Sequence, residues 1–140
     1  MELVREVLRH TPFKETVVVD GSEILGAFVG DEGGRKSFIT RMALAVEALA
    51  KVGSNCPQAL HVAYTRALQH RTTYVERTSE THNEDFRPIS QAVRQKLIPA
   101  VTGREVVNDA MEEVLGLPIR LGGLTLSSPV HSTTHGRGEF

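Results

Sequence analysis

The sequence predicts a mainly α-helical fold with a small β-hairpin near the N-terminus, an α+β arrangement with a bundle of three to four helices. Two observations lead to this prediction. Apolar residues recur at helical spacing over most of residues 35–116, whereas β-branched and glycine-rich stretches are concentrated in residues 16–34. The chain has 140 residues, which suits one domain, and only 5% are aromatic, so the core must be built mostly from aliphatic side chains.

We expect residues 1–130 to form this single domain in three parts. Residues 1–34 would hold a helix and the hairpin, residues 35–116 the helical bundle, and residues 117–130 a closing extended segment. Residues 131–140 are polar and contain glycine, so we expect a disordered tail.

The first part predicts a helix followed by a hairpin. Residues 2–10 carry apolar side chains at positions i, i+3 and i+4, which favours a short amphipathic helix. A β-branched run at residues 17–19 and an apolar run at residues 24–29 flank Asp20-Gly21, a pair typical of hairpin turns. We therefore expect the turn at Asp20-Gly21, with Gly26 giving a close approach or a bulge.

Four helices are expected to follow, each bounded by glycine, proline or a capping residue. They cover residues 35–52 after a DEGG loop, residues 57–78, about residues 84–98, and a short stretch between Asn108 and Gly116. Asn108 is a favourable N-cap, and Pro99 is expected just beyond the end of the third helix.

After Gly116 the chain reads LPIRLGGLTL, residues 117–126. A proline gives a stiff entry, and the glycine pair allows a short strand or extended segment to lie close to a neighbour. We expect Leu121, Leu124 and Leu126 to cover the bundle.

The net charge of −1 hides a basic centre between two acidic ends. Residues 35–104 carry eleven basic and five acidic residues, a net of +6, while residues 1–34 and 105–140 carry −4 and −3. A basic centre favours a polyanionic partner.

Two helix faces concentrate the polar groups of this basic centre. At about 100° per residue, Arg66, His70, Thr73 and Arg77 share one face of the second helix, and Arg87, Gln91 and Arg94 share one face of the third. Such groups donate to phosphate oxygens without reading bases. The alternative is that both faces are simply solvated.

Other functional classes find little support. Cys56 has no companion base, so we expect no catalytic residue. His131 and His135 have a helical ligand spacing but lie in the polar tail without further ligands, so we expect no metal and no cofactor. One cysteine and the absence of an apolar run of about 18–20 residues indicate an intracellular protein, of cytoplasm or nucleus, without a membrane span.

Four short segments, in order along the chain, resemble reverse transcriptases of retroelements (non-LTR or DIRS-like). They are ILGAFVG (24–30), PQALHVAYTRALQHRTTYVERT (57–78), IPAVTGREVVND (98–109) and LGLPIRLGGLTLSSPV (115–130). The first resembles the "LG-x-x-IG" segment that follows the catalytic palm, and the others resemble the helix, link and closing segment that come after it. The closing motif departs from the family, with GGLTL where GGLGI is usual, and the tail after Val130 does not match.

The resemblance implies a piece of an RNA-directed DNA polymerase: the last palm hairpin and thumb-like helices. The hairpin residues Leu25, Gly26 and Gly30 would then be primer-grip-like, and the basic helix faces would contact a primer–template duplex or RNA–DNA hybrid. The catalytic Tyr-x-Asp-Asp box, which lies upstream of the matching region in the family, is absent from the sequence. We therefore expect a non-catalytic fragment or remnant that is not an enzyme by itself.

A second interpretation remains open. The chain would be a small helical protein–protein interaction or structural module without a nucleic-acid role. In that case the hairpin and first helix, which would have faced a palm, leave an apolar surface that favours self-association.

Overall fold

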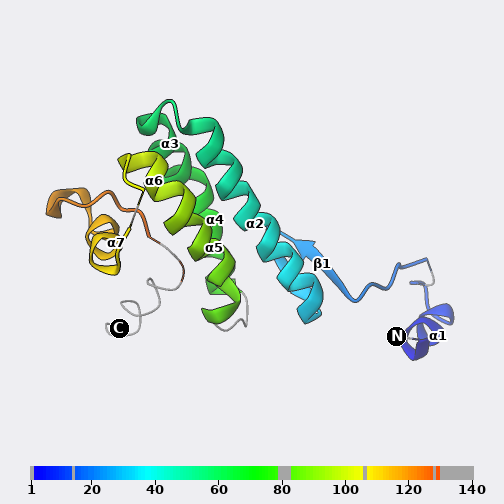
Figure 1. Cartoon of the computed structure of the whole chain (residues 1–140). Coiled ribbons are helices and arrows are strands. Elements are labelled where there is room, and N and C mark those ends of the chain that lie inside the picture. Colours follow the sequence, from blue (N-terminus) through cyan, green and yellow to red (C-terminus); the bar gives the residue numbers. More distant parts are fainter. Residues whose placement is uncertain (1, 14, 79–82, 106, 128, 130–140) are drawn as a thin grey trace.

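The computed structural model describes residues 2–13, 15–78, 83–105, 107–127 and 129. It confirms a mainly helical fold with one two-stranded antiparallel hairpin near the N-terminus. Three long helical segments pack side by side, the hairpin lies against one end of them, and the first helix is set apart beyond an extended linker (Figure 1). The predicted tail, including His131 and His135, lies outside the described residues.

Helix α1 (Glu2–Arg9) matches the predicted N-terminal helix, but none of its residues is buried. Three of its apolar side chains, Leu3, Val4 and Val7, are exposed to solvent, with Leu3 75% and Val7 60% exposed. The linker that follows is also exposed at Val17 and Val19, and residues 17–19 form no strand. The prediction of a first strand at residues 17–19 is therefore wrong.

The hairpin consists of β1 (Gly21–Ile24) and β2 (Ala27–Gly30), with Ile24 opposite Ala27. Its turn is Leu25-Gly26, with φ values of 52° and 83°, so the predicted turn at Asp20-Gly21 is wrong. Two-residue turns of this kind need positive φ at both central positions, since that twist matches the flanking strands. Gly26 meets this requirement without strain, whereas Leu25 is a leucine in the left-handed region.

Helix α2 (Glu32–Gly53) begins three residues before the predicted start at residue 35. The side chain of Asp31 accepts a hydrogen bond from the Gly34 amide at 3.1 Å and caps the first turn. Residues 32–34 of the expected DEGG loop are therefore helical, and only Asp31 lies outside the helix. The buried stripe of α2 lies in the core of the bundle: Phe38, Ile39, Met42, Ala43, Val46 and Ala50.

The predicted helix over residues 57–78 is continuous but not uniform. It comprises α3 (Pro57–Ala63), a π-helical turn η1 (Tyr64–Leu68) and α4 (Gln69–Thr78). The Gln69 amide donates to the Tyr64 carbonyl, five residues back, which widens the turn. Angular positions counted at a uniform α-helical 100° per residue therefore do not carry across η1.

The third long helix runs further than predicted. A 3₁₀ turn η2 (Asn83–Phe86) leads into α5 (Arg87–Ala92), a second π-helical turn η3 (Val93–Leu97) and α6 (Ile98–Thr102). Pro99 lies inside this helix, so its predicted position beyond the end is wrong. The Ile98 amide reaches back five residues to Val93, and Pro99 follows this widened turn, where its missing N–H and its ring are tolerated. The helix ends at Gly103, whose φ is 72°.

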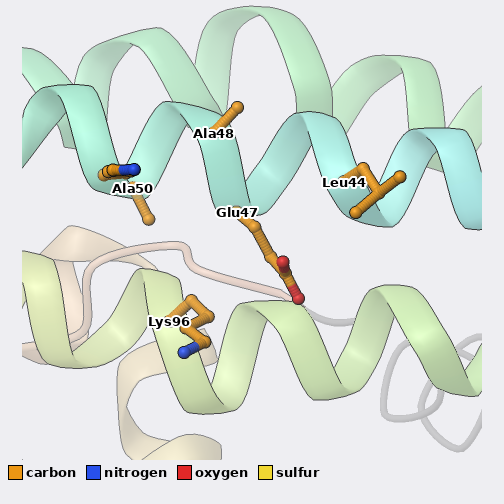
Figure 2. Close-up of a pocket in the computed structure, with 6 residues that line it drawn as sticks. Leu44, Glu47, Ala48, Ala50 and Lys96 are labelled. Carbon is orange, nitrogen blue, oxygen red and sulfur yellow. The ribbon is translucent and has the colours of Figure 1, made fainter.

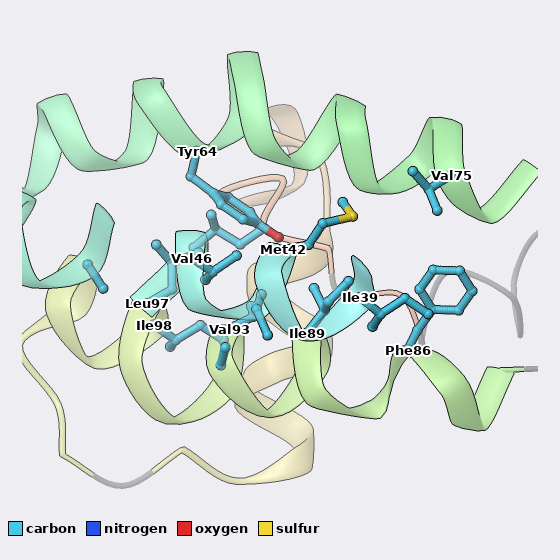
Figure 3. Close-up of a cluster of buried hydrophobic side chains, with 14 of the residues drawn as sticks. Ile39, Met42, Val46, Tyr64, Val75, Phe86, Ile89, Val93, Leu97 and Ile98 are labelled. Atoms are coloured by element: carbon cyan, nitrogen blue, oxygen red, sulfur yellow. The ribbon is translucent and has the colours of Figure 1, made fainter. Parts of the chain in front are cut away.

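The core lies where these three long helices meet (Figure 3). Tyr64 is the largest fully buried side chain of the described residues and reaches from η1 toward α2 and the third long helix (Figure 3). Its hydroxyl donates to the Ser127 carbonyl at 3.1 Å, which satisfies the one polar atom it brings into the core.

Helix α7 (Asp109–Gly116) is capped as predicted, because the Asn108 side chain accepts from the Met111 amide at 2.8 Å. A 3₁₀ turn η4 (Ile119–Leu121) follows, and the chain then returns along α7. The amides of Leu124 and Leu126 both donate to the Leu115 carbonyl, at 3.0 and 3.1 Å.

This return is an extended segment rather than a strand in the described residues. A Cβ on Gly123 would lie 2.0 Å from the Leu117 carbonyl oxygen, so the close approach expected of the glycine pair is confirmed. Leu126 is fully buried and Leu124 partly buried, as expected. Leu121 is 61% exposed, so the prediction that it covers the bundle is wrong.

Candidate nucleic-acid interface

The basic face of the second long helix is exposed. Arg66 lies in η1, and His70 and Arg77 lie in α4, all with exposed side chains. Among the described residues, no carboxylate lies within 4 Å of any of these three side chains. Thr73 is partly buried, and its hydroxyl donates to the Gln69 carbonyl at 2.9 Å, so it is already engaged within its own helix.

The π-helical turn changes how these residues share a face. His70 and Arg77 both lie in regular α4, where residues seven apart return to the same side. Arg66 lies inside the wider turn, so its offset from His70 differs from the value for a uniform α-helix. The structure therefore keeps His70 and Arg77 on one strip, with Arg66 one turn away along the same helix.

The basic face predicted on the third helix is divided. Arg87 is the first residue of α5, and both it and Gln91 are exposed. Arg94 lies in η3 and is tied to the C-terminal part of the chain. It donates to the Val107 carbonyl from Nε (3.3 Å) and Nη2 (3.0 Å), and to Asp109 from Nη1 (2.6 Å).

Arg94 also forms an ion pair with Glu112, at 3.6 Å from Nη1 to Oε2. Glu112 is only 5% exposed, so its charge is held in a poorly solvated place on α7. Arg94 thus connects the third helix to α7 and the segment before it. This is a structural role that the sequence did not reveal, because the partners are 13 to 18 residues away, beyond the end of the helix at Gly103.

A second cluster of charge was also missed in the sequence. Glu23 of β1 forms an ion pair with Arg71 of α4 (3.1 Å) and another with Arg41 of α2 (3.8 Å), through different carboxylate oxygens. Both guanidinium groups lie over the ring of Phe38, at 5.6 and 5.8 Å from its centroid. Residues 23 and 71 are 48 positions apart, and nothing local in the sequence predicts their contact. We call Glu23, Arg41 and Arg71 the two-arginine cluster.

The three primer-grip-like residues are in the hairpin, but not in equivalent places. Leu25 is at the tip and is 88% exposed. A Cβ on Gly26 would lie 4.0 Å from the Tyr74 ring, so the tip borders α4. Gly30 is at the far end, where it pairs with Gly21 and has no room for a side chain.

The surface also holds an open pocket of about 530 Å³ between α2 and η3. It is lined by Leu44, Glu47, Ala48, Ala50, Lys51 and Lys96. Glu47 points from α2 toward the helix that carries Lys96 (Figure 2). The charged groups of this lining are one carboxylate, Glu47, and two ammonium groups, Lys51 and Lys96.

Over the described ranges, no group of three or more His, Cys, Asp and Glu side chains is arranged to hold a metal ion. Within the same ranges, none of the helices combines the length and the apolar character that a membrane span needs. Cys56 is exposed and is the N-cap of α3, without a side-chain cap.

The chain was compared with known proteins at three levels. No family model, no curated protein and no solved structure matches it. The relation to reverse transcriptases therefore stays a prediction that depends on the four sequence segments alone.

Proposed function

We propose that the second long helix binds the sugar–phosphate backbone of a duplex or RNA–DNA hybrid without reading its sequence. The observation that supports this most is the pair Arg66 and Arg77. Both are exposed, and neither has a carboxylate within 4 Å among the described residues. Residues 57–78 carry three arginines against one acid, Glu76, so the helix has an excess of positive charge.

The chemistry of these groups suits phosphate. A guanidinium group offers five donors in a planar fork, is more weakly hydrated than an ammonium group and stays charged at any physiological pH. Contacts to phosphate fix the position of a protein on nucleic acid but carry no base information. The affinity should therefore depend on salt far more than on sequence, because each neutralised phosphate releases counterions.

We further propose that the chain is a non-catalytic relative of the thumb region of retroelement reverse transcriptases. The four resembling segments support this origin, and thumb helices that contact a primer–template backbone agree with the charge of the second helix. The sequence has no Tyr-x-Asp-Asp box, so the expected activity is binding alone.

The test is a salt titration of binding to a labelled RNA–DNA hybrid, followed by fluorescence anisotropy. For the wild-type chain, we expect binding at about 50 mM salt that weakens steeply toward about 200 mM. Arg66→Ala with Arg77→Ala should lower the affinity about tenfold. It should also reduce the salt slope, the slope of log affinity against log salt concentration, by the value for up to about two phosphate contacts.

The matched control is Lys51→Ala with Lys96→Ala, which also removes two positive charges, but at the α2–η3 pocket. This control should change affinity much less, and thermal melting should confirm that both double variants are folded. A wild-type chain that does not bind at about 50 mM salt, or a flat salt response, would reject the proposal. Equal losses in the two double variants would reject the assignment to the second helix.

A second candidate function is self-association, which the exposed apolar side of α1 favours. Leu3, Val4 and Val7 are all largely in solvent although the helix is strongly amphipathic in pattern. Light scattering of the wild-type chain would then report a dimer that Leu3→Glu with Val7→Glu converts to a monomer. Val52→Glu, at another exposed valine, is the control. A monomeric wild-type chain would exclude this candidate.

A further inference from the structure

The two-arginine cluster places two cations and one anion on the surface between α2, α4 and the hairpin. Each guanidinium group contacts a different oxygen of the same Glu23 carboxylate. The side chains of Arg41 and Arg71 are 66% and 46% exposed, so both remain reachable from solvent. The cluster keeps a net charge of +1 and can accept more negative charge than Glu23 supplies.

Phe38 holds the two guanidinium groups in place. Phe38 is 1% exposed and belongs to the bundle core, so its ring has a fixed position next to both guanidinium groups. Cations are attracted to the face of an aromatic ring, which restricts where Arg41 and Arg71 can move. Because these long side chains are already confined, less rotamer freedom is lost when they bind an anion.

The ligand now held by the arginines resembles part of a phosphodiester. A carboxylate and a phosphodiester each present two terminal oxygens that share one negative charge, and arginine binds both groups in similar geometry. Glu23 is itself 39% exposed, and ion pairs this exposed contribute little to stability. Replacing Glu23 with a phosphate group of a ligand therefore costs little free energy.

The position of the cluster also fits a nucleic-acid strand. Arg71 belongs to the same helix as Arg66 and Arg77, and about 100° of rotation separates it from His70. Tyr74 lies between Arg71 and the strip of His70 and Arg77, at about 40° from His70. It is 42% exposed and borders the hairpin tip. One nucleic-acid backbone lying along α4 can therefore reach both Arg71 and the strip of His70 and Arg77.

We propose that Arg41 and Arg71 bind one backbone phosphate of nucleic acid, and that Glu23 of the hairpin occupies this site when nucleic acid is absent. This inference rests on the proposed function and assigns it a second contact region. Removing the charge of Glu23 should therefore strengthen the binding of nucleic acid at Arg41 and Arg71.

The test uses the full chain and the labelled RNA–DNA hybrid, at about 50 to 200 mM salt. Glu23→Gln keeps the size of the side chain and removes its charge. Relative to Glu32→Gln, it should lower Kd by about threefold or more and increase the salt slope by about 0.9, the value for one additional phosphate on a duplex. Glu32 is the matched control because it is an exposed acid at the start of α2, paired with Lys36 rather than with the cluster.

The same substitution is then made with Arg41→Ala and Arg71→Ala. In that background Glu23→Gln should have no effect, since the site is gone. Arg41→Ala and Arg71→Ala are also tested singly with Glu23 intact. Each must weaken binding more than Lys51→Ala, which keeps the inference testable if Glu23→Gln disturbs the hairpin.

The results separate the two proposals. If Arg66→Ala with Arg77→Ala weakens binding but Glu23→Gln binds no tighter than Glu32→Gln, the proposed function stands and the cluster is only structural. If Glu23→Gln tightens binding equally without the two arginines, the cluster is also rejected, because the effect is then one of net charge. If no variant binds at about 50 mM salt, both proposals fail.

Discussion

Arg94 provides the sharpest separation between a structural arginine and a nucleic-acid contact. We consider Arg94→Met, which removes the charge and all donors but keeps an apolar stem of similar length. The substitution breaks two hydrogen bonds to the Val107 carbonyl and the ion pairs with Asp109 and Glu112. Asp109 is 82% exposed, so its share is at most about 1 kcal/mol.

Most of the cost comes from Glu112. Its side chain is 5% exposed, and removing one partner of a buried ion pair costs about 3–5 kcal/mol. Arg94 is itself 38% exposed, which lowers this value, and we expect a total loss of about 3 kcal/mol in the free energy of unfolding. For a domain of this size the loss corresponds to a drop of about 10 °C in Tm.

Urea denaturation and thermal melting, both followed by far-ultraviolet circular dichroism, measure this loss. Arg87→Met is the matched control, because Arg87 is exposed and forms no ion pair with another described residue. It should change stability by less than about 0.5 kcal/mol. Arg94→Met with Glu112→Met should recover much of the loss, since apolar side chains of similar volume replace buried ion pairs well. The reasoning is refuted if Arg94→Met and Arg87→Met melt together, or if Arg94→Met weakens nucleic-acid binding while the Tm is unchanged.

Two further predictions concern the closing segment. Burial, with a smaller contribution from the charge of Glu76, raises the pKa of the Tyr64 phenol above its usual value near 10. The neutral phenol therefore stabilises the fold below about pH 10, and this stabilisation is lost as the pH rises further. Tyr64→Phe should lower the free energy of unfolding by about 1 kcal/mol at neutral pH, because the hydrogen bond to the Ser127 carbonyl is lost. Above pH 10 the urea midpoint of this variant should fall less than that of the wild type. Parallel pH profiles of the two midpoints would contradict this explanation. Gly123→Ala should speed hydrogen exchange at the Leu124 and Leu126 amides, because its Cβ would collide with the Leu117 carbonyl. Gly103→Ala, whose added Cβ would meet no atom within 4 Å beyond its chain neighbours, should leave exchange at both amides slow. Equal exchange in the two variants would contradict the steric explanation.

The helices could be predicted from the sequence because their apolar period and end residues are local properties. Asn108 caps its helix as expected, and Gly103 ends the third long helix. The hairpin turn was missed because its first residue, Leu25, does not favour positive φ. Asp20-Gly21 is a common turn pair, but here it leads into β1, which begins at Gly21. Pro99 was misplaced for a related reason: the π-helical turn that accommodates it leaves no mark on the sequence.

The candidate site could be predicted only in part. Helical spacing was enough to group His70 with Arg77, since both lie in regular α4. It gave no information on which arginines the rest of the fold would engage, because ion pairs depend on tertiary contacts. Arg94 contacts residues beyond Gly103, and Arg71 contacts a strand near the N-terminus, so neither role follows from a face of one helix.

The pattern of ion pairs explains why the overall charge is a poor guide to function. Every ion pair among the described residues joins a base of residues 35–104 to an acid of one acidic end: Glu23 or Glu32 on one side, Asp109 or Glu112 on the other. The ends thus neutralise part of the basic centre within the folded chain. Arg66, Arg77 and Arg87 lie outside this internal neutralisation, so they carry positive charge that is available to an external anion. Glu23 differs from the other acids because it forms ion pairs with two arginines at once. This shortage of negative charge is the reason we propose that a phosphate can replace Glu23 at the site.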